Sequence, residues 1–328
     1  MSLHHKGEFR HGIHSINCFA LEVPSHDEAR RFFEAFGLRV HREPEGGALA
    51  LRAVASDHVW GRLYEGERKR TAYLSLYCFE DDYAGLAEQV RAYGGVPVEG
   101  GPYANDTGFW FRDPDGNLLQ VSVGPKLTGD APAHRTPETL RSAGTRGVLG
   151  RSDTGLVHPA RLSHVLMFST DLDRSVDFYR DVLGLRLSDR SQDAVAFMHA
   201  CHGCDHHLIA FAKSHAPGWH HSSWEVGSVN DVGRGGEQMR DAGYMEGWGT
   251  GRHVLGSNYF YYVRDPWGSF AEYSFDIDYV PAGVAWDAGN YPPEDSLYLW
   301  GPALPDYFIR NTETQADPVR SGGVNDAT

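Results

Sequence analysis

The sequence predicts an α+β fold of two tandem domains, in which each domain holds two units of strand, helix and further strands. Two repeated patterns support this prediction. A strand, a helix and a glycine stop occur near residue 19 and again near residue 165, and an Asp-Pro-x-Gly sequence occurs at residue 113 and again at residue 265. The length of 328 residues also fits about two domains of ~100–200 residues each.

The first half of each copy reads as a strand followed by an amphipathic helix. In the first copy, residues 19–23 (FALEV) precede a helical pattern at 27–36. In the second copy, residues 165–168 (VLMF) precede the same pattern at 172–179. Each helix carries two adjacent aromatic residues, and a glycine follows it, where helices commonly end. A further strand is expected after each glycine.

The second half of each copy reads as a helix followed by a hairpin. Residues 88–95 and 237–244 share a Glu-Gln pair at the start and a glycine near the end of a helical pattern. The Asp-Pro-x-Gly sequence that follows is typical of a tight turn, and strand-rich segments flank it on both sides. The four units are therefore expected at residues 16–60, 70–123, 162–211 and 220–275.

The repeat sets the expected domain boundaries. It is too long for a solenoid unit and indicates a duplicated domain. We expect a first domain at residues 12–125, a linker at 126–160, a second domain at 161–300 and a C-terminal tail at 301–328. The linker is rich in Gly, Pro, Thr and Arg, and the tail becomes polar after about residue 312.

Charge and composition exclude several classes of protein. The formal net charge is −14 with histidine neutral. An acidic protein repels nucleic acid and anionic membranes, so neither is an expected partner. No apolar run approaches the ~20 residues of a membrane span, and the N-terminal residues contain no apolar signal core. We therefore expect a soluble cytoplasmic protein.

The four cysteines do not form a disulfide framework, because they are few and unevenly spaced. Such usage fits a reducing compartment. Cys201 and Cys204 form a single Cys-x-x-Cys pair, which leaves a zinc or redox site open as an alternative. No second pair and no thioredoxin-like pattern accompanies it, so the prediction does not include a cysteine metal site.

Three good metal ligands occur in the second copy at positions where the first copy has none. Alignment of the copies places His164, His221 and Glu272 opposite Cys18, Ala72 and Gln120. Taken singly, each of the three would fit an ordinary strand residue. A duplication kept for packing alone would not differ so consistently at three distant positions. Two His and one carboxylate on one face of a metal form the facial triad of non-haem Fe(II) oxygenases, which leaves positions open for substrate and O₂.

Five stretches of the second copy also carry a family resemblance, namely LSHVLM at 162–167, HHLIAF at 206–211, WHHSSWEV at 219–226, GRH at 251–253 and YVRDP at 262–266, which leads to Glu272. With these stretches the chain resembles the type I extradiol ring-cleaving dioxygenases of the vicinal oxygen chelate superfamily, the group of catechol 2,3-dioxygenase and 2,3-dihydroxybiphenyl 1,2-dioxygenase. The resemblance covers about residues 12–300. It implies paired βαβββ modules, a degenerate first domain, and one Fe(II), or alternatively Mn(II), on His164, His221 and Glu272.

The same resemblance assigns the catalytic residues. The family's catalytic histidine falls on His207, with His206 as the alternative, and a further active-site pair falls on His253 and Tyr262. The implied reaction is extradiol cleavage of a catechol-type ring with O₂, with His207 as general acid/base and the other two bonded to substrate oxygens. A pairing of His207 with Asp205, and plain core packing of Tyr262, stay open.

Other members of this superfamily are isomerases such as glyoxalase I, and metal-free binding proteins. The isomerases generally use more carboxylate in the metal site and lack the set formed by His207, His253 and Tyr262, whereas the binding proteins lack the three ligands. The residues therefore favour a dioxygenase in aromatic compound degradation. The family tends toward homo-oligomers, so we expect one here, with a small aromatic diol and O₂ as the other partners.

The tryptophans and arginines near the site suggest an apolar substrate. Trp248, Trp219 and Trp224 lie close in sequence to His253 and His221 and could form a flat apolar wall. We therefore expect a catechol with an apolar 3-substituent, such as 2,3-dihydroxybiphenyl. A carboxylate tail would need a basic residue in the pocket, and the only such residues close in sequence are Arg252 and Arg264, of which Arg252 could turn inward.

Overall fold

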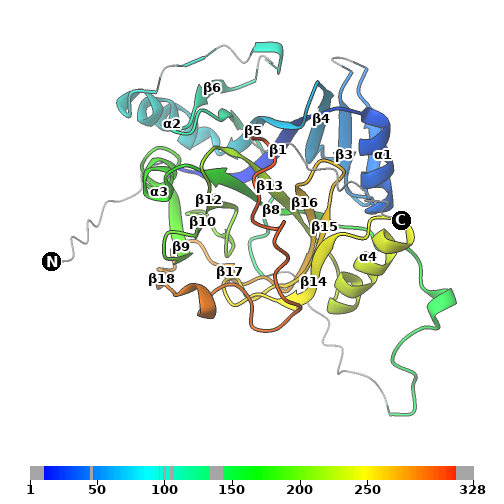
Figure 1. Ribbon diagram of the computed structural model, residues 1–328. Helices are drawn as coiled ribbons and strands as arrows, with labels where there is room; N and C mark the ends of the chain where they lie inside the picture. The colour runs from blue at the N-terminus through cyan, green and yellow to red at the C-terminus, as the bar shows by residue number, and fades with distance from the viewer. Residues whose placement is uncertain are drawn as a thin grey trace, which may run out of the picture.

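The computed structural model describes residues 11–44, 47–95, 97–98, 101–103, 107–132 and 143–314. Its two large sheets come from the two copies of the repeat, one from residues before 124 and one from residues after 160 (Figure 1). The expected α+β fold is confirmed. The linker prediction includes residues 133–142 and the tail prediction includes residues 315–328, which lie outside the described residues, and the domain bounds stay predictions.

The first sheet has seven strands in the order β2-β3-β4-β1-β5-β7-β6. Its central strands β1 and β5 are antiparallel, and each pairs in parallel with the last strand of its own unit, β4 or β7. The bounds are β1 (Ile13–Val23), β2 (Arg39–Arg42), β3 (Leu49–Arg52), β4 (Gly61–Glu65), β5 (Arg70–Cys78), β6 (Phe109–Arg112) and β7 (Leu118–Val123). The first unit thus extends past residue 60, and the second has two strands after its helix among the described residues.

The second sheet repeats this plan with nine strands in the order β14-β15-β16-β13-β8-β12-β10-β9-β18. Its central strands β8 and β13 are antiparallel, with β12 and β16 as their parallel neighbours. The bounds are β8 (Arg161–Ser169), β9 (Leu185–Ser191), β10 (Val195–Ala200), β12 (Ile209–Lys213), β13 (Gly218–Glu225), β14 (Gly247–Arg252), β15 (Tyr259–Arg264), β16 (Phe270–Phe275) and β18 (Gly289–Asn290), and β11 (Cys204–Asp205) pairs separately with β17 (Tyr279–Val280).

Short polar side chains and glycines set the ends of the helices. The helices are α1 (His26–Ala35), α2 (Glu80–Ala92), α3 (Leu172–Asp181) and α4 (Val229–Asp241). The side chains of Ser25, Asp171 and Ser228 accept the first free backbone N–H groups of α1, α3 and α4, which is the usual helix N-cap. The glycine stop of the repeat, Gly37 or Gly184, has positive φ, as a helix end requires.

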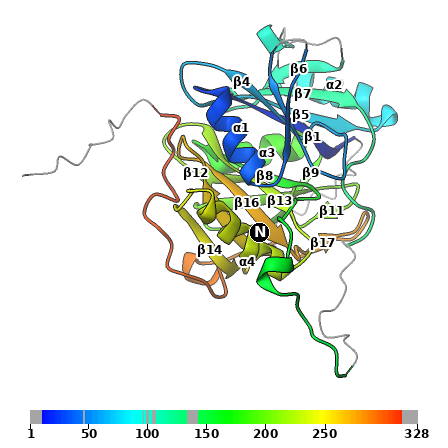
Figure 2. The same cartoon turned by 90° about the vertical axis from the view of Figure 1, so that its right-hand side faces the viewer.

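The repeated Glu-Gln pair joins the two copies. Gln238 of α4 donates through Nε2 to the carbonyl of Ala35 at the end of α1 (2.7 Å), and Gln89 of α2 donates to the carbonyl of Val182 just after α3 (2.9 Å). The first helix of each copy therefore packs beside the second helix of the other, and Figure 2 shows α1 and α4 on one side of the molecule. The glutamines satisfy carbonyls that a helix end leaves free.

Aromatic side chains fill the space between the two sheets. Phe19 of β1 contacts Trp219 and Trp224 of β13, with ring centroids 5.0 and 6.3 Å apart, and Phe36 stacks on Tyr273 of β16 at 3.9 Å. Large buried aromatic rings contribute strongly to core stability. The two copies thus share one core, against which the second sheet holds its site. Among the described residues, no helix is long and apolar enough to cross a membrane.

Candidate metal centre and active site

Five neighbouring strands of the second sheet carry one row of side chains that face the same way. Ser223 of β13 lies opposite His164 of β8 on one side and Glu272 of β16 on the other. Tyr262 of β15 lies opposite Glu272, and Trp248 of β14 lies opposite Tyr262. Residues paired across adjacent strands project to the same face. The strand register therefore lets His164 and Glu272 meet above the small side chain of Ser223.

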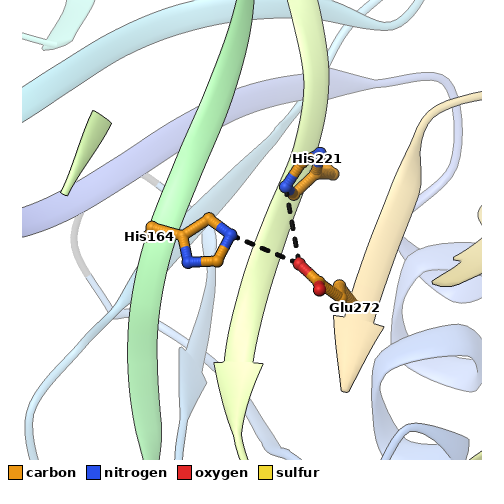
Figure 3. A group of neighbouring side chains, drawn as sticks. All are labelled: His164, His221 and Glu272. Carbon is orange, nitrogen blue, oxygen red and sulfur yellow. Dashed lines mark ion pairs between the residues drawn. The ribbon is translucent and has the colours of Figure 1, made fainter. Parts of the chain in front are cut away.

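His221 completes the group from the same strand as Ser223. The Nε2 atom of His164 lies 3.3 Å from Oε2 of Glu272, and Nε2 of His221 lies 3.5 Å from the same oxygen (Figure 3). All three residues are buried. In the part of the chain that the structure describes, these three form the one group of three or more His, Cys, Asp or Glu whose ligand atoms converge. The alternative site at Cys201 and Cys204 is not part of any such group.

The chemistry of this group fits a metal cation. His221 Nε2 and Glu272 Oε2 are buried and have no hydrogen-bond partner among the described residues. Buried polar atoms without partners are costly, and a cation at this point would satisfy them. Asn258 donates from Nδ2 to the other carboxylate oxygen, Glu272 Oε1, at 3.2 Å. Because Asn258 bonds Oε1, the other oxygen, Oε2, is left to face the two imidazoles and the position between them where a cation would bind.

The partner of His164 fixes which ring nitrogen is free. The hydroxyl of Ser163 donates to Asp205 Oδ2 (3.1 Å), and Asp205 also pairs with Arg161 (2.8 Å). The Ser163 oxygen lies 3.2 Å from His164 Nδ1 and, because its proton is committed to Asp205, it accepts the Nδ1 proton. Nε2 of His164 is then the bare nitrogen, which is the form that binds a metal.

His220 fixes which ring nitrogen of His221 is free. The Nε2 atom of His220 donates to the backbone carbonyl of Phe308 (2.8 Å), so a neutral His220 has its lone pair on Nδ1. That nitrogen lies 2.7 Å from His221 Nδ1 and accepts its proton. Burial lowers the pKa of His220 to about 4, which keeps it neutral. His221 Nε2 is therefore bare as well. The segment around Phe308, which falls in the predicted tail at 301–328, packs behind the site.

His207 lies beside His164, and Tyr262 lies opposite Glu272 in the strand register. The ring of His207, in the loop before β12, lies 4.0 Å from the ring of His164 between centroids. Burial, followed by the nearby imidazoles, holds the pKa of His207 well below its usual value. Burial, followed by the Glu272 carboxylate, raises the pKa of Tyr262 well above its usual value. Each stays neutral in the metal-free site and is able to exchange a proton with a ligand between them.

His253 is the hydrogen-bond partner of the Tyr262 hydroxyl. Its Nδ1 donates to the carbonyl of Leu297 (2.7 Å), which leaves Nε2 as the acceptor of the Tyr262 hydroxyl at 3.0 Å. The ring of His253 stacks on Phe260, with centroids 4.1 Å apart. The oxygen of Tyr262 is thus free to accept a hydrogen bond from a bound hydroxyl, with His253 Nε2 placed to take the tyrosine proton. All six residues predicted for the site are brought together around one point.

Two of the three tryptophans suggested for an apolar wall do not line the site. Trp219 and Trp224 do not line it, because they pack on Phe19 in the core between the sheets. A bulge at His220 lets Trp219 and His221 pair with consecutive residues of β8, which turns Trp219 to the opposite face. The alternative left open for His207, a pairing with Asp205, does not occur, because Asp205 bonds Arg161 and Ser163.

The strand register also corrects the alignment of the copies. Cys18 pairs with Ser75, and Ser75 pairs with Gln120, as His164, Ser223 and Glu272 do in the second sheet. In that register Ala20 pairs with Tyr73 where Leu166 pairs with His221. The counterpart of His221 is therefore Tyr73 and not Ala72, since the connection from strand to helix is one residue longer in the second copy.

The two arginines considered for a substrate carboxylate are paired elsewhere. Arg252 bonds the hydroxyl of Tyr259 at 2.5 Å and lies 3.5 Å from the Asp276 carboxylate. Arg264 bonds Glu246 at 2.5 Å and lies over the ring of Tyr307. Sequence reasoning missed Asn258, Ser223 and His220 as parts of the site. His220 and Ser223 lie within two residues of His221, and this spacing could have indicated them. No such spacing applies to Asn258.

The chain is similar to one protein family and to several known proteins. Residues 161–273 match the family model of the Glyoxalase/Bleomycin resistance protein/Dioxygenase superfamily. Metapyrocatechase 2 of Cupriavidus necator is 58% identical over 307 residues, which are 93% of this chain and 94% of the relative. An iron-dependent extradiol dioxygenase of Rhodococcus jostii (strain RHA1) is 29% identical over 58% of this chain and 62% of its own length.

A solved structure supports the fold. The crystal structure of BphC, a halotolerant catechol dioxygenase, superimposes with a TM-score of 0.70 and 24% sequence identity, and the match covers 89% of this chain and 94% of that one. The likeness to metapyrocatechase 2 extends over nearly the whole of both chains. This chain is a type I extradiol dioxygenase and belongs to the Glyoxalase/Bleomycin resistance protein/Dioxygenase superfamily.

Proposed function

We propose that the enzyme opens a catechol-type ring beside its two hydroxyls with O₂, using one Fe(II) ion held by His164, His221 and Glu272. The observation that carries this proposal is the convergence of two bare imidazole nitrogens, 3.3 and 3.5 Å from one carboxylate oxygen, with all three ligand atoms within 4.8 Å of one another. Two His and one carboxylate suit non-haem Fe(II), and the R. jostii relative is iron-dependent. The same donors also suit Mn(II), which is the alternative metal.

The metal, when bound, supplies Lewis acidity that lowers the pKa of the catechol hydroxyls and a path for electrons between the ring and O₂. The protein supplies the proton acceptors. Tyr262 accepts a hydrogen bond from one hydroxyl and takes its proton as it passes its own to His253 Nε2, 3.0 Å away, so His253 is the final acceptor on this side. His207 lies beside His164, on the other side of the ligand group from Tyr262 in the strand order, and its Nε2 is the free nitrogen. A diol has two protons to release, and the site has two acceptors for them, His207 directly and His253 through Tyr262.

The buried setting of His207 suits proton transfer in both directions. Its Nδ1 is engaged by His206 (3.0 Å), and its Nε2 bonds no residue in the portion of the chain that the structure describes. An imidazole so placed takes a proton from a substrate oxygen and returns it as the ring opens, which is general base and then general acid catalysis. The low exposure of the site keeps water from competing for that proton.

Replacement His207→Ala is expected to leave the metal bound and to lower kcat by about 10²–10⁴-fold, the usual effect of losing a general acid/base. The loss should appear in kcat more than in KM, since His207 is not one of the three proposed ligands. Steady-state kinetics and metal analysis of the same preparation check it. Normal turnover would mean that His207 has been misassigned.

We further propose that the substrate carries no carboxylate tail. Arg252 and Arg264 are both committed to acidic partners, so neither offers a free cation to a second anionic group. Three tryptophans led to the prediction of an apolar 3-substituent. Of these, Trp248 still supports it, since its ring stacks beside that of Tyr262. Homo-oligomeric assembly and a cytoplasmic location stay predictions.

A substrate panel tests both the function and its specificity. The Fe(II)-loaded enzyme is given catechol, 2,3-dihydroxybiphenyl and homoprotocatechuate, and the coloured ring-opened products are followed together with O₂ uptake. Both uncharged catechols should give the higher kcat/KM values, with 2,3-dihydroxybiphenyl first if the 3-substituent prediction holds. A clear preference for homoprotocatechuate would reject the uncharged substrate and point to Arg252, and the absence of any coloured product would reject the reaction itself.

A further inference from the structure

A hydrogen-bonded chain behind His207 ends at a buried carboxylate. Nδ1 of His207 lies 3.0 Å from Nδ1 of His206, and Nε2 of His206 lies 2.8 Å from Oδ2 of Asp189 on β9. The residues are 3%, 0% and 5% exposed, respectively. None of the three belongs to the metal-ligand group, and Asp189 comes from a strand distant in sequence from the loop that carries the two histidines.

The Asp189 carboxylate, at the end of this hydrogen-bonded chain, fixes which nitrogen donates in each bond. A carboxylate only accepts hydrogen bonds, so His206 donates from Nε2 to Asp189. A neutral His206 then has its lone pair on Nδ1, and that lone pair accepts a proton from His207 Nδ1. His207 therefore carries its own lone pair on Nε2, which is the nitrogen free to take a proton in the site.

The surrounding residues hold the chain in place. Asp189 Oδ1 accepts the backbone N–H of Gly289 at 2.7 Å, and the indole of Trp286 donates toward Oδ2 at 3.4 Å. Phe197 contacts the rings of both histidines, with centroids 5.9 Å from His206 and 4.8 Å from His207. Neither imidazole is free to swing away, so the position of the Asp189 carboxylate decides the state of His207.

We propose that Asp189 and His206 are positioning residues that set the tautomer of His207. The inference rests on the proposed function, in which His207 Nε2 exchanges a proton with the substrate. It extends that function by two residues that touch neither metal nor substrate. The arrangement resembles a carboxylate that orients a catalytic imidazole through hydrogen bonds, except that a second imidazole lies between them.

Asp189→Asn tests the proposal with almost no change in shape. The N–H of Gly289 holds the amide oxygen at the Oδ1 position, so the new NH₂ group faces His206 Nε2. His206 must then accept there and donate from Nδ1, and His207 is left with its proton on Nε2. In a Ser-His-Asp site the same substitution produces the wrong tautomer and costs about 10⁴-fold in kcat. We expect a loss of at least ~10²-fold in kcat here, with KM and metal content unchanged.

Three further variants separate the tautomer from general damage. Asp193→Asn changes a carboxylate on the same β9–β10 hairpin, 70% exposed, and should leave kcat unchanged. His206→Gln has an oxygen to accept from His207 and an NH₂ to donate to Asp189, so it should retain most activity. His206→Met fills similar space without an acceptor and should lose activity as Asp189→Asn does. Equal activity of the glutamine and methionine variants would overturn the proposal, even if Asp189→Asn fails to fold.

Nitrogen-15 NMR of histidine-labelled protein gives a readout that does not depend on turnover. With Zn(II) in place of iron, His207 of the parent should show a protonated Nδ1 and a bare Nε2, and Asp189→Asn should reverse the two. The signal of His207 is identified by its loss in His207→Ala. An unchanged pattern in Asp189→Asn would overturn the proposal. A parent that opens no catechol ring would count against the proposed function, while the tautomer measurement would still decide the role of Asp189.

Discussion

Glu272→Gln is expected to abolish metal binding and, at the same time, to stabilise the metal-free protein. Asn258 donates to Oε1 at 3.2 Å, so the amide oxygen of the glutamine takes that place and the NH₂ group takes the place of Oε2. It then donates toward the bare nitrogens of His164 and His221, which lie 3.3 and 3.5 Å away. The two lone pairs that would bind the metal are thereby occupied.

The expected size of this effect is large. Loss of a residue that merely supports a ligand costs about 10–100-fold in metal affinity, so loss of the ligand itself should exceed ~100-fold. Competitive Fe(II) titration and thermal unfolding with and without metal measure the two effects. Glu246→Gln, on the surface beside Arg264, is the matched control and should behave as the parent does. Fe(II) binding to Glu272→Gln at the parent's affinity would contradict the assignment.

Lys69→Met is expected to destabilise the fold by about 3–5 kcal/mol, because it leaves a buried carboxylate without its counter-charge. Nζ of Lys69, before β5, lies 3.3 Å from Oδ2 of Asp265, and the two side chains are only 4% and 6% exposed. Asp265 also accepts the backbone N–H groups of Trp267 and Ser269 in the turn that leads into β16. The ion pair therefore ties the first copy to the strand that carries Glu272.

Urea unfolding of the metal-free protein measures the change. The control is Asp57→Asn. The Asp57 side chain pairs with Arg39 and is 93% exposed, so its loss should lower the free energy of unfolding by only about 0–1 kcal/mol. A loss below about 1 kcal/mol in Lys69→Met would mean that the pair is solvated in solution and does not join the copies.

The site was largely predictable because its residues differ between the copies. His164 and Glu272 were found at registered positions of the repeat, and the resemblance placed His207, His253 and Tyr262. The side of a strand that a residue faces was harder to predict, because one extra residue reverses it. The bulge at His220 therefore misled the prediction for Trp219, and the connection before α4, one residue longer than its counterpart before α2, misled the alignment of His221.

Residues that act from other strands could not be predicted from spacing. Asp189 meets His206 only because β9 lies near the loop before β12 in the sheet order. Phe308 lies in a segment expected to be a tail, yet its carbonyl is the acceptor that orients His220. Both contacts depend on how distant parts of the chain pack, which no local pattern of polar and apolar residues records.

The central claim is that one metal ion, held by the second copy alone, carries out ring cleavage with O₂. The most direct measurement loads the metal-free protein with Fe(II) under anaerobic conditions, counts the bound metal, and then follows O₂ uptake and product mass on addition of catechol. The account predicts one ion per chain, one O₂ consumed per catechol and both oxygen atoms in a ring-opened product. Two ions per chain, or metal binding without any O₂ uptake, would contradict it.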